Sequence, residues 1–331
     1  MPASCRPRST HKRFVKQEGL GQDDLLTIFQ LFGMFLVIGS EFRGFHLRFK
    51  DVARGGIRIV KSRGSDSYAI NARSLFDENY ALANTQNRKN KDIPEGGAKG
   101  VILLDVESQD KARVAFEKYI DCLLDLLIPP ASPGIKDTIV DLYGPEETLF
   151  FGPDEGTADF VDWGTLHTRK RGARTWKSTF TGKSPTLGGI PHDRYGMTTL
   201  SVREYVQGIY RKLGLKEEEM RKLQTGGPDG DLGSNEILLS HENYIAIVDG
   251  SGVLCDPKGL DKTELVRLAE QRLMISHFAV EKLSKDGYRV LVDETDVVIP
   301  GGEVVSAGTA FRNTFHLRPG SYDIFVPCGG R

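Results

Sequence analysis

The sequence has 331 residues, which is long enough for two domains that each bury a hydrophobic core. Hydrophobic residues make up 39% and charged residues 27%, a composition typical of soluble α/β proteins that excludes a fibrous or disordered chain. The formal net charge of -1 argues against a nucleic-acid partner, because phosphate-binding proteins usually carry a basic excess.

Four scattered cysteines form no CxxC pair, which argues against a disulfide framework and favours an intracellular, reducing compartment. The seven histidines show no HxxxH spacing, so no metal site is expected. The most apolar stretch, Leu25 to Gly39, has about 15 residues, fewer than the roughly 20 of a membrane helix, so we expect no membrane contact.

The compartment itself stays open between cytoplasm and mitochondrion. A run of basic residues without an acid precedes the apolar stretch: Arg6, Arg8, Lys12, Arg13 and Lys16. Such a run is compatible with a mitochondrial presequence, but also with a solvated tail or with sequence foreign to the fold.

The first half of the chain alternates strands and helices. Residues 35–49 alternate large apolar and polar side chains, which predicts extended structure that Gly55 and Gly56 interrupt. A helix is expected over 74–84, a loop over the glycine-rich run 89–100, and a buried strand directly after it. A strongly amphipathic helix follows from about 109 to 127 and ends at Pro129. The next residues, to about 189, read as loops around short elements.

The second half begins with a helix over 198–213, for which Gly214 is a natural C-cap. Strands over 244–248, 288–292 and 322–328 then alternate with helical segments, and Asp261 with Glu264 resembles a capping box. This alternation predicts a doubly wound sheet. The fold class is therefore α/β: a substrate-binding domain with a mixed sheet over 33–205, then a Rossmann-like domain over 206–331, with 1–32 as an unmatched N-terminal segment.

A glycine-rich turn before a helix is the first candidate binding motif. Gly230 and Gly233 match the last two glycines of GxGxxG, but Pro228 stands at the first, and Gly227 lies one residue early. Backbone N–H groups in such a turn can approach a pyrophosphate, although an ordinary glycine-rich turn remains the alternative. Asp249 closes the next strand, where a carboxylate can accept a hydrogen bond from a ribose 2′-hydroxyl and repel a 2′-phosphate. The alternative is that Asp249 only starts a turn.

Lys99, in the run PEGGAKG, is the sharpest candidate for catalysis. Shielding by small neighbours and cations such as Arg54, Arg58, Lys89 and Lys91 would lower its pKa and make it a usable base. The alternative is a solvated lysine in a glycine turn. Asp154, in GPDEGT, could move a proton on a substrate amine or could simply cap a turn. The run TGKS at 181–184 is not a phosphate loop, because Lys177 stands where its first glycine is required.

Together these motifs resemble the large NAD-dependent class of glutamate dehydrogenases of fungi and some protists. The resemblance rests on five phrases in order: FRGFHLRFKDVARGGIRIV, SLFDENYALANTQNRKNKDIPEGGAKGVILLD, LYGPEETLFFGPDEGTADFVDW, FTGKSPTLGGIPHDRYGMTT and LQTGGPDGDLGSNEILL. It implies an oxidoreductase that converts L-glutamate, NAD and water to 2-oxoglutarate, ammonium and NADH, and a homo-oligomer in the full-length enzyme.

The resemblance also implies roles for individual residues. Lys99 matches the lysine that activates water, and Asp154 matches the aspartate that exchanges a proton with the amino group. Substrate carboxylates would be bound by Arg54, Arg194 and, in place of a family lysine at Asn87, Lys89 or Lys91. The cofactor would contact Thr198, Gly227, Asp229, Gly230, Asp231, Leu232 and Asp249. Because relatives extend beyond both ends, the sequence also allows a catalytically inactive fragment that at most binds nucleotide.

Overall fold

The computed structural model describes residues 31–62, 64–89, 91–128, 145–318 and 322–329. The basic run before residue 20, the start of the apolar stretch at Leu25 and the proline pair at 129–130 lie outside these ranges. The chain divides into two compact units, one up to Pro191 and one from His192 onward, and each is described by itself.

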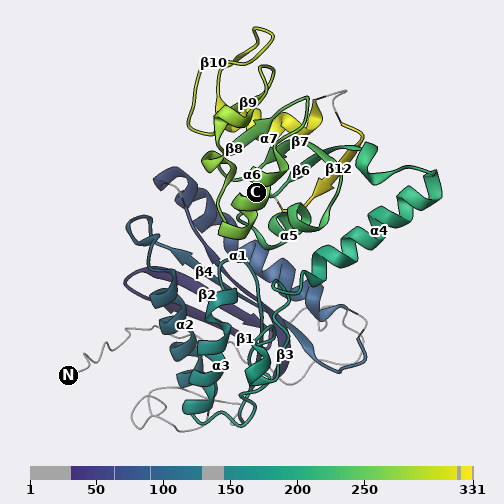
Figure 1. Ribbon diagram of the computed structural model, residues 1–331. Helices are drawn as coiled ribbons and strands as arrows, with labels where there is room; N and C mark the ends of the chain where they lie inside the picture. The colour runs from purple at the N-terminus through teal and green to yellow at the C-terminus, as the bar shows by residue number, and fades with distance from the viewer. Residues whose placement is uncertain (1–30, 63, 90, 129–144, 319–321, 330–331) are drawn as a thin grey trace, which may run out of the picture. The chain divides into compact units, whose positions relative to one another are not determined.

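The first unit is built on a five-stranded mixed sheet in the order β1-β2-β4-β3-β5 (Figure 1). Its strands are β1 (Gly33–Ile38), β2 (Phe42–Arg48), β3 (Val52–Val60), β4 (Gly96–Leu104) and β5 (Thr148–Pro153). Strand β3 runs parallel to both β4 and β5, whereas β2 is antiparallel to β1 and β4. Parallel neighbours end at the same edge, so residues at the ends of β3 and β5 can meet.

Three helices cover the two faces of this sheet: α1 (Ser65–Asn87), α2 (Ala112–Leu127) and α3 (Val161–Lys170). Ile57 of β3 packs in one core with Phe116 of α2, and Val101 of β4 packs in another with Leu75 of α1. Alternate residues of a strand point to opposite faces, so α1 lies on one face and α2 on the other.

Several sequence expectations for this unit need correction. The helix expected over 74–84 runs from Ser65 to Asn87. The short elements expected among the loops up to about 189 include the helix α3 at 161–170. Gly55 and Gly56 do not interrupt the strand, because β3 continues through them. The expected loop before residue 100 is also wrong at its end, because Gly96 to Gly100 belong to β4. These glycines allow another backbone to pack closely against the strand rather than forming a turn. A Cβ on Gly97, for example, would overlap the backbone of α1.

The second unit contains a five-stranded sheet in the order β12-β6-β7-β8-β9. Its strands are β6 (Arg221–Thr225), β7 (Asn243–Val248), β8 (Gly252–Cys255), β9 (Tyr288–Leu291) and β12 (Ile324–Pro327); β10 (Val297–Val298) and β11 (Val304–Val305) form a separate pair. Its helices are α4 (Met197–Leu213), α5 (Asp231–Leu239), α6 (Lys262–Gln271) and α7 (Gly308–Thr314). Strands β12, β6 and β7 are parallel, and β8 and β9 complete the sheet in antiparallel pairing.

Two helix ends predicted from the sequence of this unit are confirmed. Helix α4 ends at Gly214, whose φ of 67° is in the left-handed region. Asp261 caps α6 by accepting a hydrogen bond from the Glu264 backbone N–H at 2.7 Å. The reciprocal half of the capping box is absent from the bonds described for Glu264, whose side chain binds Arg267 instead.

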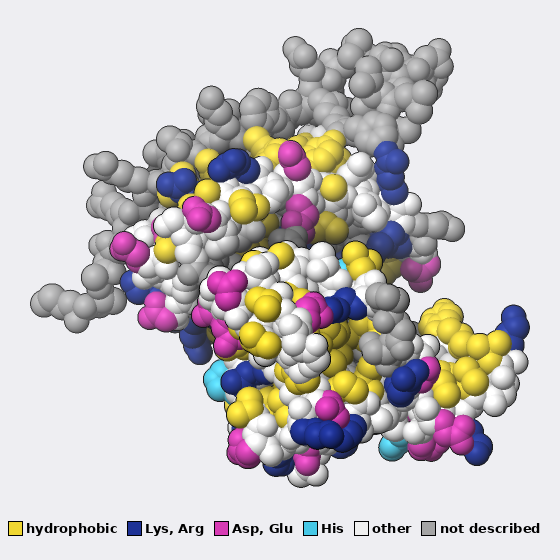
Figure 2. Space-filling model, turned by 90° about the horizontal axis from the view of Figure 1, so that it is seen from above, with side chains coloured by type: hydrophobic (Ala, Val, Ile, Leu, Met, Phe, Trp, Pro, Cys, Tyr) yellow, Lys and Arg dark blue, Asp and Glu magenta, His cyan; other side chains and the backbone are white. Residues whose placement is uncertain are grey.

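Helix α4 exposes apolar side chains along one face: Tyr205 is 77% exposed, Ile209 53% and Leu213 63%. Apolar side chains gather on the projecting segment at the right of Figure 2, where α4 also lies in Figure 1. The opposite face buries Thr199, Arg203, Val206 and Tyr210. Among the described residues, no helix combines the length and hydropathy required to cross a membrane.

Candidate active site

Lys99 and Asp154 form an ion pair between the Nζ atom and the Oδ2 atom. Lys99 projects from β4, and Asp154 directly follows β5, where its backbone N–H donates to the Ile57 carbonyl at 3.0 Å. The Lys99 side chain is 11% exposed and that of Asp154 38%. The sheet therefore brings together the two residues that the sequence assigned to proton transfer, with the amine shielded and the carboxylate reachable from solvent.

Gly56 provides the space for this ion pair. A Cβ atom at residue 56 would overlap the Asp154 carboxylate and lie 2.7 Å from the Lys99 Nζ atom. Neighbouring Gly55 has a different constraint, because its Cβ would overlap the carbonyl of Ala98 in β4. The glycine pair thus admits a backbone contact on one side of β3 and the Lys99–Asp154 pair on the other.

Arg54 of β3 and Lys91, which precedes β4, both face one buried carboxylate, that of Glu95. The Glu95 Oε1 atom is 3.1 Å from Lys91 Nζ and 3.5 Å from Arg54 Nε. The guanidinium of Arg54 also lies over the Phe150 ring, 5.3 Å from its centroid. Arg54 shares a strand face with Gly56 because the two are two residues apart. Glu95 was not singled out from the sequence.

Other cations named from the sequence are placed differently. Lys89 is exposed beyond the end of α1. Arg58 forms an ion pair with Glu78 of α1 at 2.8 Å. Asn87, at the position of the family's second lysine, has a structural contact, because its Oδ1 atom accepts the Gly97 backbone N–H at 3.1 Å. Of these lysine candidates, Lys91 is therefore the one held beside Arg54.

The second unit carries the remaining candidates. Arg194 and Thr198 are exposed at the start of α4. Asp193, which directly precedes Arg194, binds Arg272 through both carboxylate oxygens at 2.7 and 2.8 Å. It also accepts a hydrogen bond from the Asn235 side-chain amide at 2.9 Å. These bonds tie the segment that carries Arg194 to α5 and α6, an arrangement that the sequence did not predict.

The glycine-rich turn joins β6 to the first turn of α5. Gly226 has a φ of 88°, which favours glycine, and Gly230 is the N-cap of α5. A Cβ on Gly233 would overlap the Gly227 carbonyl, so the third glycine allows the turn to fold over the helix. The free backbone N–H groups at a helix N-terminus favour an anion, which fits a pyrophosphate at this turn.

Asp249 lies at the end of β7 with its carboxylate turned inward. It is 2% exposed, its Oδ1 atom accepts both the backbone N–H and the hydroxyl of Ser251 at 2.6 Å, and its Oδ2 atom accepts the Ile275 N–H at 2.8 Å. The turn-forming role considered from the sequence is therefore present. Contact with a ribose remains a prediction for this residue.

A cavity of about 640 Å³ opens at the carboxyl ends of three adjacent parallel strands. Thr225 of β6, Val248 of β7 and Pro327 of β12 lie at this edge. Arg312 and Asn313 of α7 and His316, in the 3-10 turn that follows α7, form another wall. The edge where parallel strands end is the usual ligand site of open α/β sheets. The wall contributed by α7 was missed from the sequence, because no local motif marks it.

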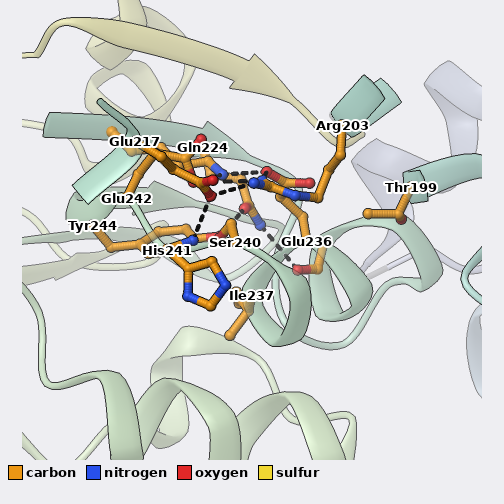
Figure 3. Close-up of polar contacts among 12 residues, drawn as sticks. Thr199, Arg203, Glu217, Gln224, Glu236, Ile237, Ser240, His241, Glu242 and Tyr244 are labelled. Atoms are coloured by element: carbon orange, nitrogen blue, oxygen red, sulfur yellow. Dashed lines mark hydrogen bonds and ion pairs between the residues drawn. The ribbon is translucent and has the colours of Figure 1, made fainter. Parts of the chain in front are cut away.

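A buried ionic cluster joins α4, β6 and α5, and β6 and α5 are the elements on either side of the turn (Figure 3). Arg203 of α4 donates to Glu236 of α5 at 2.8 Å, and fully buried Lys222 of β6 pairs with both Glu236 and Glu242. Burial is the largest single influence on the Glu242 carboxyl and raises its pKa, but Lys222, Arg203 and the Tyr210 hydroxyl together lower that pKa overall. Paired charges of this kind fix the helices that flank the turn.

Comparison with known proteins identifies the relatives of this chain. The profile of the Glutamate/Leucine/Phenylalanine/Valine dehydrogenase family matches residues 188–331. Over 302 residues the chain is 74% identical to the NAD-specific glutamate dehydrogenase of Neurospora crassa, and 62% to the probable NAD-specific glutamate dehydrogenase of Schizosaccharomyces pombe. The chain is homologous to NAD-specific glutamate dehydrogenases. This confirms the resemblance predicted from the five motifs.

The alignments cover 91% of this chain but only 29% and 27% of the two relatives, so the chain spans less than a third of their length. Among solved structures, glutamate dehydrogenase of Plasmodium falciparum matches with a TM-score of 0.52 at 13% identity, over 84% of this chain and 56% of that one. This likeness supports the α/β fold predicted from the sequence.

Proposed function

We propose that this chain provides the glutamate site and the dinucleotide-binding turn of an NAD-dependent glutamate dehydrogenase. The reaction is oxidative deamination of L-glutamate to 2-oxoglutarate and ammonium. The observation that carries the proposal is the Lys99–Asp154 ion pair, which stands on the same sheet as Arg54 and beside Gly56. Cations for carboxylates, a shielded lysine and a reachable carboxylate are the groups that this chemistry needs.

Arg54 and Lys91 would bind a substrate carboxylate through charge-assisted hydrogen bonds. Arg54 is 43% exposed and oriented by the Phe150 ring, so its guanidinium is available to an incoming anion. Lys89, on the surface, and Arg194, in the second unit, stay in the proposal as further carboxylate contacts.

The proton steps are assigned to the ion pair. Asp154 would accept a proton from the substrate ammonium, which frees the nitrogen lone pair to stabilise the iminium that forms at Cα. Lys99 would act in its neutral form, after its ammonium has released a proton to solvent, and would take a proton from the water that attacks the iminium carbon. Asp154 would then return its proton to the amine, and the carbinolamine hydroxyl would lose its proton to solvent as ammonia departs. Because Nζ of Lys99 and Oδ2 of Asp154 are in contact, a proton can pass directly between the two groups.

The second unit fits a dinucleotide. The turn that contains Gly227 and Gly230 leads into α5, whose first-turn N–H groups have no partner within the helix and would face the pyrophosphate. The cavity at the strand ends gives room for a ligand of that class. Asp229, Asp231 and Leu232 of the turn, Thr198 and Asp249 complete the proposed contacts. When bound, NAD would accept the hydride from Cα of glutamate. NAD is preferred to NADP because the similar enzymes named above are NAD-specific.

The direct test mixes the purified chain with L-glutamate and NAD and follows NADH absorbance, with NAD affinity measured by calorimetry. We expect turnover, and tighter binding of NAD than of NADP. NAD binding without turnover would support the alternative of a catalytically inactive, nucleotide-binding chain. Absence of both would refute the proposal for this chain.

A further inference from the structure

Glu95 is a buried carboxylate held between two cations, and it immediately precedes β4, the strand that carries Lys99. Its side chain is 5% exposed, whereas those of Lys91 and Arg54 are 13% and 43% exposed. The same oxygen, Oε1, faces both cations, at 3.1 Å from Lys91 Nζ and 3.5 Å from Arg54 Nε. A buried carboxylate is costly unless it is paired, and here two positive groups compensate it.

The backbone around Glu95 holds it in place. Its N–H donates to the Ile93 carbonyl at 2.8 Å, and Gly96, the next residue, begins β4. A Cβ at residue 96 would lie 2.8 Å from the Lys50 side chain, so this stretch is packed closely against β2 and its following turn. Lys99 lies four residues further along the chain, within β4. Glu95 is thus anchored to the strand that carries the proposed base.

Arg54, Lys91 and Glu95 together carry an excess of positive charge. Arg54 and Lys91 contribute two positive charges, and Glu95 contributes one negative charge. The local excess is one positive charge, which complements one substrate carboxylate. At distances of 3 to 4 Å a further charge changes anion binding markedly, even when the surrounding dielectric is moderately high.

We propose that Glu95 is a specificity-determining residue, an internal carboxylate that competes with the substrate carboxylate for Arg54 and Lys91. This inference rests on the proposed function, in which these two cations bind substrate. Glu95 orients both cations before substrate arrives and keeps the free site from carrying two uncompensated charges. It thereby limits affinity for anions and leaves room for a single carboxylate.

The test is Glu95→Gln, which keeps the size of the side chain and removes its charge. We expect KM for both glutamate and 2-oxoglutarate to fall by about threefold to tenfold, with kcat unchanged or lower. Glu95→Asp keeps the charge and should keep KM close to that of the unaltered chain. Glu41→Gln is the matched control, since it breaks a partly buried pair with Lys118 in the same unit and should leave KM unchanged.

A binding measurement separates this inference from the proposed function. Glutarate, a dicarboxylate without the reacting amine, should bind Glu95→Gln more tightly in calorimetry, again by about threefold to tenfold. An unaltered chain that turns over glutamate, together with unchanged or raised KM in Glu95→Gln, would overturn the role of Glu95 alone. An unaltered chain that neither turns over glutamate nor binds glutarate would remove the proposed function and this inference with it. Should Glu95→Gln not fold, Glu95→Ala carries the same prediction.

Discussion

Lys99 Nζ and Asp154 Oδ2 are in contact although 55 positions separate the two residues in the sequence. The contact exists because β4 and β5 both pair with β3 in parallel, on opposite sides of it. Two residues predicted separately for proton transfer therefore meet across one intervening strand, above the glycine at residue 56.

Lys99→Met should abolish most glutamate oxidation. Methionine matches the length of lysine but cannot take a proton, and loss of a general base usually lowers kcat by about 10²- to 10⁴-fold. The measurement is the rate of NADH formation, with NAD affinity as a second readout. Affinity should persist, because the glycine-rich turn belongs to the other unit. Lys61→Met, which alters an exposed lysine of the first unit, is the control. Rates near normal in Lys99→Met would refute the assignment.

Gly56→Ala should impair catalysis more than stability. The added methyl group would occupy the space of the Asp154 carboxylate and crowd Lys99 Nζ, but both atoms are at the ends of side chains that can swing away. We therefore expect kcat to fall at least tenfold while the unfolding free energy changes by less than about 1 kcal/mol. Gly64→Ala is matched, since a Cβ there meets no described atom within 4 Å. Equal rates in the two variants would contradict a role for the ion pair.

Gly233→Ala and Gly230→Ala should differ in their effects on the second unit. A Cβ on Gly233 meets the backbone of Gly226 and Gly227, which cannot move without opening the turn, so we expect about 1–3 kcal/mol of lost stability together with weak NAD binding. A Cβ on Gly230 has its nearest contact at 3.8 Å, so the fold should persist. NAD affinity should nevertheless fall in Gly230→Ala if the pyrophosphate approaches the helix N-terminus closely. Thermal unfolding and calorimetry measure the two effects, and undiminished affinity in Gly230→Ala would place the ligand elsewhere.

The helices and strands of the second unit followed from sequence because their signals are local. A capping aspartate at residue 261, a C-cap glycine at 214 and a glycine turn before α5 each act within one turn of a helix. The family resemblance, once its motifs were in order, also identified the two residues of the ion pair. These predictions needed no knowledge of which strands are neighbours.

The glycines of the first unit show what local signals miss. Glycine usually marks a turn, so the runs at 55–56 and 96–97 were read as breaks, yet both continue as strand. Their cause is tertiary, because Gly97 admits the backbone of α1 and Gly56 admits the Lys99–Asp154 ion pair. Glu95 was missed for the same reason, since its two cationic partners come together only when β3 and β4 pair.

Glu264 predicts a measurable dependence of stability on pH. Hydrogen bonds from Arg267 lower the pKa of this carboxyl from 4.5 to about 2, with the Ala279 N–H assisting. A depressed pKa in the folded state means that the stabilisation is complete above the unfolded value near 4.5 and is lost as pH falls toward 2.

Glu264→Gln should therefore lower the unfolding free energy by about 1.5–3 kcal/mol at pH 7, the usual worth of hydrogen bonds to a charged group. The difference from the unaltered chain should shrink as pH falls from 5 toward 2, because protonation removes the same interaction. Denaturant unfolding at several pH values measures this. Glu270→Gln, which changes an exposed glutamate of the same helix, should have little effect at any pH. If the free energy of unfolding changed with pH in the same way in Glu264→Gln and in the unaltered chain, the Glu264–Arg267 pair would contribute nothing to the loss of stability at acid pH.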